Sequence, residues 1–333
     1  MTGTTTLADA RRRIAPRPAR DLIIEHLDLA HGLRISALSQ LDLGVYRADR
    51  TEGPALVVRV FPALRPHAAV AGDAEILELL ADSDFSSERI AAPEPLSVLY
   101  GQSVLVTEYV ESVPRSERRD AIRAAGGLRR LGEMLGQLHA LPVHGGAAAR
   151  TGGGWHHLVD GSPQDEIEAA RALLADCADR VPAGGERAYQ SLRQELSELD
   201  SGAGLPQALT HPDFVLANVV AEPGGGMVVV DWAGAGRGPR AWSLAFLLWA
   251  EGAKNLARVD LVAAGYRRHV QLEPEELRRL PAMLGARPAV LAAWSFCLGR
   301  LSLADAARTA AEAHSVAGAA GPRAVAALAS PAA

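Results

Sequence analysis

The spacing of apolar side chains predicts strands in the N-terminal part of the chain. Between residues 33 and 110, apolar and β-branched runs predict four short strands, which are Leu33–Ser39, Val45–Ala48, Ala55–Phe61 and Ser103–Glu108. Between the last two runs the period changes. An apolar face of helical spacing is formed there by Val70, Ala74, Leu77 and Ala81. This part of the chain therefore predicts a small sheet with one helix.

Helical periods dominate from about residue 115 onward. A leucine stripe at helical spacing consists of Leu128, Leu131, Leu135 and Leu138. Residues 165–200 predict one or two amphipathic helices, with a break near Pro182–Gly185. Two apolar segments, Leu209–Val220 and Met227–Val230, flank the turn Gly224-Gly225-Gly226 and predict a hairpin among the helices.

These elements predict an α+β protein with two unequal lobes. We expect an N-terminal arm or first helix over residues 1–32 and a small mixed β/α lobe over residues 33–110. A hinge near residues 109–112 would lead to a larger helical lobe over residues 111–321, and an Ala/Pro-rich tail, residues 322–333, would be flexible. A cleft between two such lobes is a common place for a ligand.

Composition narrows the class of protein. With 333 residues, 48% of them hydrophobic, the chain can bury a core, which excludes a disordered protein. A net charge of −5 argues against a nucleic-acid partner. The apolar stretch Ala241–Ala250 is far shorter than the roughly 20 residues of a membrane helix. Cys177 and Cys297 are too few for a disulfide framework, and with no secretory segment they favour the cytoplasm.

The densest polar cluster lies in the expected hairpin. His211, Asp213 and Asn218 occupy the otherwise apolar segment HPDFVLANVV, and Asp231 follows the next apolar run. Buried carboxylates and amides need dedicated partners. Because Mg²⁺ prefers hard oxygen ligands, two acids and an amide at the ends of a hairpin indicate a magnesium and phosphate site.

The order His-x-Asp-x-x-x-x-Asn, followed by a strand that ends in Asp231-Trp232, resembles the aminoglycoside phosphotransferase and choline kinase-like family. Flanking segments are similar to that family as well. They are LVVRVF around Arg59, the helix with Glu75, TEYV at residues 107–110, LGEMLGQLHAL and Gly238-Pro239. The resemblance spans about residues 33–250 and implies a bilobal protein-kinase-like fold.

The resemblance implies a transfer of the ATP γ-phosphate to a hydroxyl of a small molecule. Asp213 would accept or orient the proton of the acceptor hydroxyl, and His211 would support the catalytic loop. Asn218 and Asp231 would hold Mg²⁺ on the ATP phosphates. Phosphoryl transfer needs positioning and charge neutralisation more than covalent chemistry, and these groups supply both.

For the nucleotide, the resemblance implies a second group of residues. Arg59 would bind the α- and β-phosphates and would be braced by Glu75 on the following helix. The backbone of Glu108, Tyr109 and Val110 would receive the edge of the adenine.

The sequence departs from the family pattern at several positions. Arg59 stands where a lysine is usual, and the only lysine of the chain is Lys254. The phosphate-covering segment Ser39–Gly44 has a single glycine, Gly44. Ser243 replaces the Asp that commonly braces the catalytic loop, and Pro212 replaces the Gly after its histidine.

Simpler interpretations stay open beside the functional one. Asp and Asn are common in turns, so the hairpin residues could be structural. The adjacent His156-His157 pair suggests a loop or substrate-facing pair rather than a zinc site. The acids of residues 160–168 suit a helix N-terminus or could attract a cationic substrate. The alternative function is nucleotide or metabolite binding by a catalytically impaired protein of the same fold. The sequence does not indicate an oligomeric state.

Overall fold

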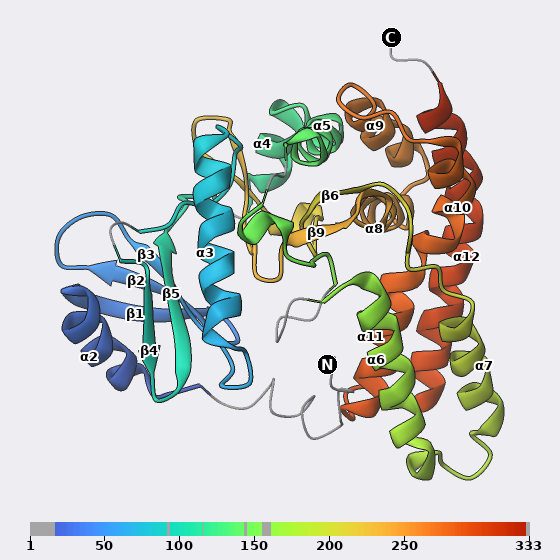
Figure 1. Ribbon diagram of the computed structural model, residues 1–333, viewed down its shortest axis with the longest axis horizontal. Coiled ribbons are helices and arrows are strands. Elements are labelled where there is room, and N and C mark those ends of the chain that lie inside the picture. Colours follow the sequence, from blue (N-terminus) through green and yellow to red (C-terminus); the bar gives the residue numbers. More distant parts are fainter. Residues whose placement is uncertain (1–16, 92–93, 115, 143–144, 155–160, 331–333) are drawn as a thin grey trace.

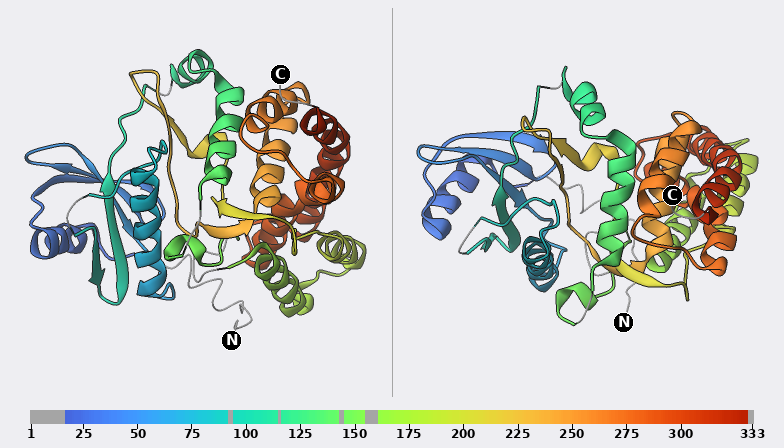
Figure 2. Two further views of the ribbon diagram at one scale, coloured as in Figure 1. Left: turned by 45° about the horizontal axis from the view of Figure 1, so that its top comes forward. Right: turned by 90° about the horizontal axis from the view of Figure 1, so that it is seen from above.

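The computed structural model describes residues 17–91, 94–114, 116–142, 145–154 and 161–330, and it shows a mixed α+β protein with two lobes. Figure 1 shows a sheet-containing lobe on the left and a larger helical lobe on the right. Both views of Figure 2 keep this separation. The expected bilobal fold class is therefore confirmed.

The N-terminal lobe is built on a five-stranded antiparallel sheet of order β1-β2-β3-β5-β4. Its strands are β1 (Ile35–Asp42), β2 (Val45–Arg50), β3 (Leu56–Val60), β4 (Leu96–Leu99) and β5 (Gln102–Glu108). Helices α2 (Arg20–His31) and α3 (His67–Asp82) pack on this sheet. The alternation of side chains along β3 turns Val58 and Val60 toward the α2 core and leaves Arg59 on the opposite face.

The C-terminal lobe is mainly helical. Its helices are α4 (Arg118–Ala124), α5 (Gly127–Ala140), α6 (Pro163–Asp176), α7 (Glu186–Ser197), α8 (Arg240–Gly252), α9 (Ala257–Tyr266), α10 (Pro274–Leu284), α11 (Ala286–Cys297) and α12 (Leu303–Ala329). Helices α5 and α9 pack so closely that a Cβ atom at Gly265 would overlap the Arg129 carbonyl oxygen. The leucine stripe of α5 is buried, as its helical spacing predicts.

One stretch of the described chain, Pro274–Cys297, could cross a membrane by length and composition alone. It is not the apolar stretch Ala241–Ala250 noted in the sequence. In the structure 72% of its apolar window is buried, and the stretch forms the packed helices α10 and α11. A buried core helix passes the same length and composition test.

Two short antiparallel pairs lie between the helices. The hairpin β7 (Val219–Ala221) and β8 (Met227–Val229) confirms the hairpin predicted around the three glycines, with shorter strands. The segment before it does not join this hairpin. Instead β6 (Gln207–Thr210) pairs with β9 (Gly236–Pro239) and so holds the two flanks of the polar cluster together.

One strand of the sheet lies outside the sequence predictions, and one sequence expectation is wrong. The sequence does not predict strand β4, because Pro93 and Pro95 interrupt its approach; the strand forms by pairing with β5 and packs on α2. The tail expected over residues 322–333 is helical as far as Ala329, since α12 continues through Pro322 and packs along α10 and α11. Tertiary packing there outweighs the helix-breaking tendency of a single proline.

Candidate active site

The β7–β8 hairpin is fastened to the N-terminal lobe by the segment that follows α3. Ser87 forms a parallel bridge with Val229, and the Glu88 N–H donates to the Val229 carbonyl over 3.0 Å. The Ser86 hydroxyl donates to the Met227 carbonyl over 2.7 Å. In both views of Figure 2 the hairpin reaches from the helical lobe toward the sheet. These bonds place Asp231, two residues after the end of β8, beside strand β3.

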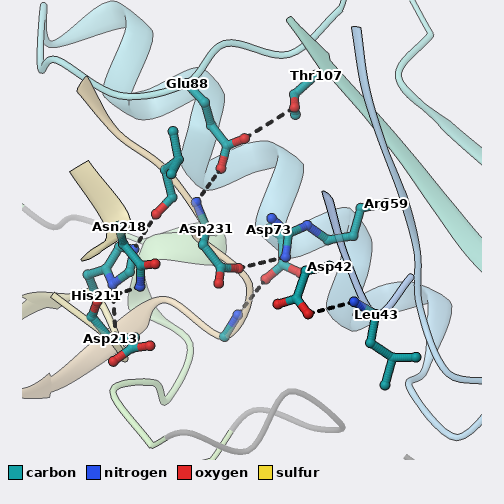
Figure 3. Close-up of polar contacts among 12 residues, drawn as sticks. Asp42, Leu43, Arg59, Asp73, Glu88, Thr107, His211, Asp213, Asn218 and Asp231 are labelled. Atoms are coloured by element: carbon teal, nitrogen blue, oxygen red, sulfur yellow. Dashed lines mark hydrogen bonds and ion pairs between the residues drawn. The ribbon is translucent and has the colours of Figure 1, made fainter. Parts of the chain in front are cut away.

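Arg59 and Asp231 meet at this junction. Arg59 Nη1 lies 2.6 Å from Asp231 Oδ1, and Figure 3 shows the two side chains pointing toward one another from opposite lobes. Asp231 has a φ of 72°, a left-handed conformation that is uncommon for a residue with a side chain. Burial lowers the pKa of Arg59, but the nearby carboxylates of Asp231, Glu88 and Asp73 outweigh it and hold that pKa above its ordinary value.

Glu88 is a buried acid of this site that the sequence did not indicate. It is 5% exposed, and its Oε1 accepts the Asp231 N–H over 2.8 Å. Its Oε2 accepts from the Thr107 hydroxyl of β5 over 3.1 Å. Burial raises the pKa of Glu88 in spite of the nearby Arg59. Glu88 therefore fixes the backbone of Asp231 and adds a second carboxylate near the guanidinium.

The brace expected between Arg59 and Glu75 is not formed. Glu75 is exposed on α3 and has no ion pair within the described chain. Asp73, two positions earlier, is the acid that α3 turns inward, and it is 1% exposed. Two residues along a helix are about 200° apart, so Asp73 and Glu75 lie on opposite faces. Asp73 shares the buried face with Val70 and Leu77, a position that the apolar period could have indicated.

Asp73 links the two lobes. Its Oδ2 lies 2.6 Å from Arg65, and its Oδ1 lies 2.5 Å from Arg150 of the helical lobe. The same Oδ1 accepts the Gly234 N–H over 3.1 Å, three residues after Asp231. An acid buried with two guanidiniums is well compensated, so this cluster holds α3 against the helical lobe.

The catalytic-loop residues expected from the sequence lie together after β6. The Asp213 N–H donates to His211 Nδ1 over 3.0 Å, and His211 Nε2 lies 3.1 Å from the Val230 carbonyl. These contacts assign the proton of a neutral His211 to Nε2, and burial lowers the pKa of this histidine. A neutral imidazole with both nitrogens engaged supports the loop and has no nitrogen left for acid–base chemistry.

Asn218 and Ser243 complete the support of this loop. Asn218 Nδ2 donates to the Asp213 carbonyl over 2.9 Å, which orients the amide so that Oδ1 is the oxygen that a cation could use. The Ser243 hydroxyl donates to the His211 carbonyl over 3.0 Å. Ser243 thus contacts the loop, as a brace at this position should, although it reaches only a carbonyl.

The expected hinge lies where β5 leaves the sheet. The Glu108 N–H donates to the Arg89 carbonyl over 2.8 Å, and the Tyr109 N–H donates to the Ala55 carbonyl over 3.1 Å. The Val110 N–H has no acceptor within the described part of the chain. Among the backbone N–H groups of the expected hinge, the Val110 N–H is therefore the donor that an adenine could use.

The turn between β1 and β2 lies at the rim of the site. Asp42 Oδ1 accepts the Leu43 N–H over 2.7 Å, so this donor is occupied within the turn. Gly44 has a φ of 73°, and a Cβ atom there would lie 2.5 Å from the Val60 carbonyl oxygen. Arg17 Nε also donates to that oxygen, over 2.9 Å. Only a glycine fits this close approach.

The donor set of the site suits Mg²⁺. Asn218 and Asp231 offer the hard oxygen atoms that this ion prefers, and Mg²⁺ takes few ligands from protein. In the described chain no group of three or more His, Cys, Asp or Glu residues could hold a metal by itself.

Of the other acidic and histidine candidates, the structure describes Asp165 at a helix terminus. Asp165 lies in a capping box with Ser162 at the start of α6, which favours the helix-terminus interpretation. The His156-His157 pair and Asp160 lie outside the described residues.

Comparisons with known proteins agree with this geometry. A sequence model described as the phosphotransferase enzyme family matches residues 37–280. No curated protein matches the sequence.

Among solved structures, a spectinomycin phosphotransferase in complex with ADP and spectinomycin is similar, with a TM-score of 0.61 and 14% identity over 91% of this chain and 99% of that one. A microcompartment-associated aminopropanol kinase has a TM-score of 0.60 and 20% identity over 90% and 97%. The choline kinase LicA from Streptococcus pneumoniae has a TM-score of 0.59 and 15% identity over 90% and 98%. At these identities the likeness shows the fold.

Proposed function

Because this chain belongs to the phosphotransferase enzyme family, we propose that it transfers the γ-phosphate of ATP to a hydroxyl group of a small molecule. The observation that carries the proposal is the contact of Arg59 with Asp231 across the two lobes, on the side of the cluster that holds Asn218 and Asp213 (Figure 3). Phosphoryl transfer is catalysed mainly by positioning and charge neutralisation. This constellation offers a carboxylate for the acceptor, oxygen ligands for a cation and a guanidinium for phosphate.

Asp213 is the proposed partner of the acceptor hydroxyl. The acceptor oxygen forms a bond to the γ-phosphorus while the bond from that phosphorus to the β–γ bridging oxygen breaks and ADP leaves. The hydroxyl proton passes to the Asp213 carboxylate. His211 holds the backbone of Asp213 in place, because its Nδ1 accepts the Asp213 N–H.

Arg59 is the proposed phosphate ligand, and it has to change partners to act. Its guanidinium lies on Asp231 in this structure, and a guanidinium fork matches phosphate oxygens well. Asn218 and Asp231 would hold Mg²⁺, which supplies charge neutralisation on the ATP phosphates. Glu88 keeps the backbone of Asp231 in its left-handed conformation while these partners exchange.

The acceptor is proposed at the level of its chemical class. The similar structures include a spectinomycin phosphotransferase, an aminopropanol kinase and a choline kinase. We therefore expect a small organic acceptor with a free hydroxyl.

Nucleotide or metabolite binding without turnover is the second candidate function. It is favoured by the β1–β2 turn, where Asp42 occupies the Leu43 N–H that a phosphate would otherwise use. Ser243 also gives the loop a shorter brace than a carboxylate would.

Slow hydrolysis of Mg·ATP in the absence of acceptor separates these possibilities. We expect Asp213→Asn to lower the rate by about 10²–10⁴-fold, the usual scale for a lost general base, and Asp231→Asn to abolish it. Asp260→Asn is the matched control, because this surface acid of α9 pairs, among the described residues, with Arg323 of α12. Equal rates in wild type, Asp213→Asn and Asp231→Asn would contradict the catalytic assignment. Calorimetric binding of Mg·ATP without hydrolysis would favour the second function.

A further inference from the structure

Arg287 is a buried cation at a position where its own helix, α11, does not stabilise a positive charge. It is the second residue of α11 and is 2% exposed. A positive charge near a helix N-terminus opposes the helix dipole, and burial of a charge is costly without a partner. Arg287 also lies beyond the segment 37–280 that the family model matches.

The side chain of Arg287 is directed at the catalytic loop. Its Nη1 donates to the Pro212 carbonyl over 2.6 Å, and its Nη2 lies 3.2 Å from Asp213 Oδ1. The guanidinium also lies over the Phe246 ring of α8, 4.9 Å from the ring centroid. One group therefore holds both a backbone oxygen and the carboxylate of the loop, while the aromatic ring limits its movement.

With Arg287 included, the three successive carbonyl groups of the loop all have donors. His211 O accepts from Ser243, Pro212 O accepts from Arg287, and Asp213 O accepts from Asn218. Arg287 alone reaches the Asp213 side chain among these donors. Its contact with Oδ1 leaves Oδ2 of the partly exposed carboxylate for the acceptor.

We propose that Arg287 is a positioning residue for phosphoryl transfer, which orients the Asp213 carboxylate and takes over the bracing role that Ser243 fills only in part. The proposal rests on the function proposed above. Arg287 itself does not contact the acceptor, because it is buried behind Asp213. Its contribution to rate passes through the carboxylate that it holds.

Three variants test this with ATP hydrolysis. Arg287→Met should lower kcat about 10²-fold, as expected for a misplaced catalytic group, while KM for ATP stays within about threefold. Arg287→Lys should recover part of the loss, because an ammonium can hold one of the two oxygens. Arg279→Met is the control. It also removes a half-buried guanidinium from the helical lobe, where it pairs with Asp200 away from the loop.

The dependence on Asp213 is tested by combining variants. In the Asp213→Asn background, Arg287→Met should cause no further loss of rate, because both changes remove the same oriented carboxylate. Multiplicative losses in the double variant, or equal losses for Arg287→Met and Arg279→Met, would overturn the proposal.

Hydrogen exchange provides a readout that does not require activity. Amides of residues 207–219 should exchange about 10- to 100-fold faster in Arg287→Met than in Arg279→Met, the factor expected for lost bonds to a charged group. If Arg287→Met does not fold, Arg287→Lys is measured instead, with about tenfold faster exchange expected. If wild type hydrolyses no ATP, the proposed function has failed, and exchange alone decides whether Arg287 holds the loop. Unchanged exchange would overturn this role.

Discussion

Replacement of Arg59 by Met is expected to weaken nucleotide binding far more than it weakens the fold. Met keeps much of the apolar stem and removes the guanidinium, so the 2.6 Å contact with Asp231 is lost. A hydrogen bond to a charged group contributes about 1.5–3 kcal/mol. The two side chains are 18% and 34% exposed, so water can rehydrate the carboxylate. We therefore expect a loss near the lower limit, about 1.5 kcal/mol of unfolding free energy.

The loss in nucleotide affinity is expected to be larger because the bound state uses the guanidinium more fully. An arginine fork can donate two charge-assisted bonds to phosphate oxygens, compared with the 2.6 Å contact of Nη1 to Asp231 here. The difference of about one such bond, 1.5–3 kcal/mol, corresponds to a 10- to 100-fold rise in Kd. Isothermal calorimetry with Mg²⁺ and a non-hydrolysable ATP analogue measures this directly, and urea unfolding measures the stability.

Lys254→Met is the matched control, since it also removes one positive charge and replaces it with the same side chain. Lys254 pairs with Glu251 over 2.7 Å, and Glu251 keeps a second partner in Arg258 at 2.9 Å. Its loss should change the Kd of the nucleotide by less than about twofold, because a distant surface charge is screened. If the two variants bind equally, or if Lys254→Met binds more weakly, Arg59 is not a phosphate ligand.

Three further substitutions test the buried charge of Glu88 and the packing of the helical lobe. Burial raises the pKa of Glu88 above the ordinary 4.5, so the stability tied to its proton is lost as pH rises through the folded-state pKa. Glu88→Gln should therefore raise Tm relative to wild type by an amount that grows with pH above about 4.5, and a difference that shrinks with pH would contradict this. Gly265→Ala should cost about 2–3 kcal/mol in urea unfolding, because its Cβ would overlap the Arg129 carbonyl of α5. Gly318→Ala in α12 faces open space and should stabilise by up to about 1 kcal/mol, and equal effects of the two changes would refute the packing argument.

Much of the fold could be predicted because its signals are local. The strand at Ala55–Phe61 and the leucine stripe of α5 depend on periods of two and 3.6 residues, which a sequence shows directly. Proline signals were less reliable. Pro322 lies inside α12, where contacts with α10 and α11 keep the helix continuous. Local preferences give way there to the apolar area that a long helix buries.

The part of the candidate site that forms a motif of fixed spacing could be predicted from the sequence. His211, Asp213, Asn218 and Asp231 lie within one short segment, and pairing of β6 with β9 and of β7 with β8 brings them together. The family resemblance implies a brace on α3 at Glu75. Helix geometry turns that residue to solvent and buries Asp73 instead.

The sequence by itself determined the two-lobed α+β arrangement, the polar hairpin motif and the arginine in the position of a lysine. Only the tertiary structure decided which charges surround that motif. Glu88 reaches it by pairing beside β8, and Arg287 reaches it from a helix that begins more than 70 residues after Asp213. The physical reason is that a buried charge is stable only beside its partner. Packing brings such partners together even when they are distant in sequence, and no periodic pattern or motif spacing in the sequence reveals the pairing.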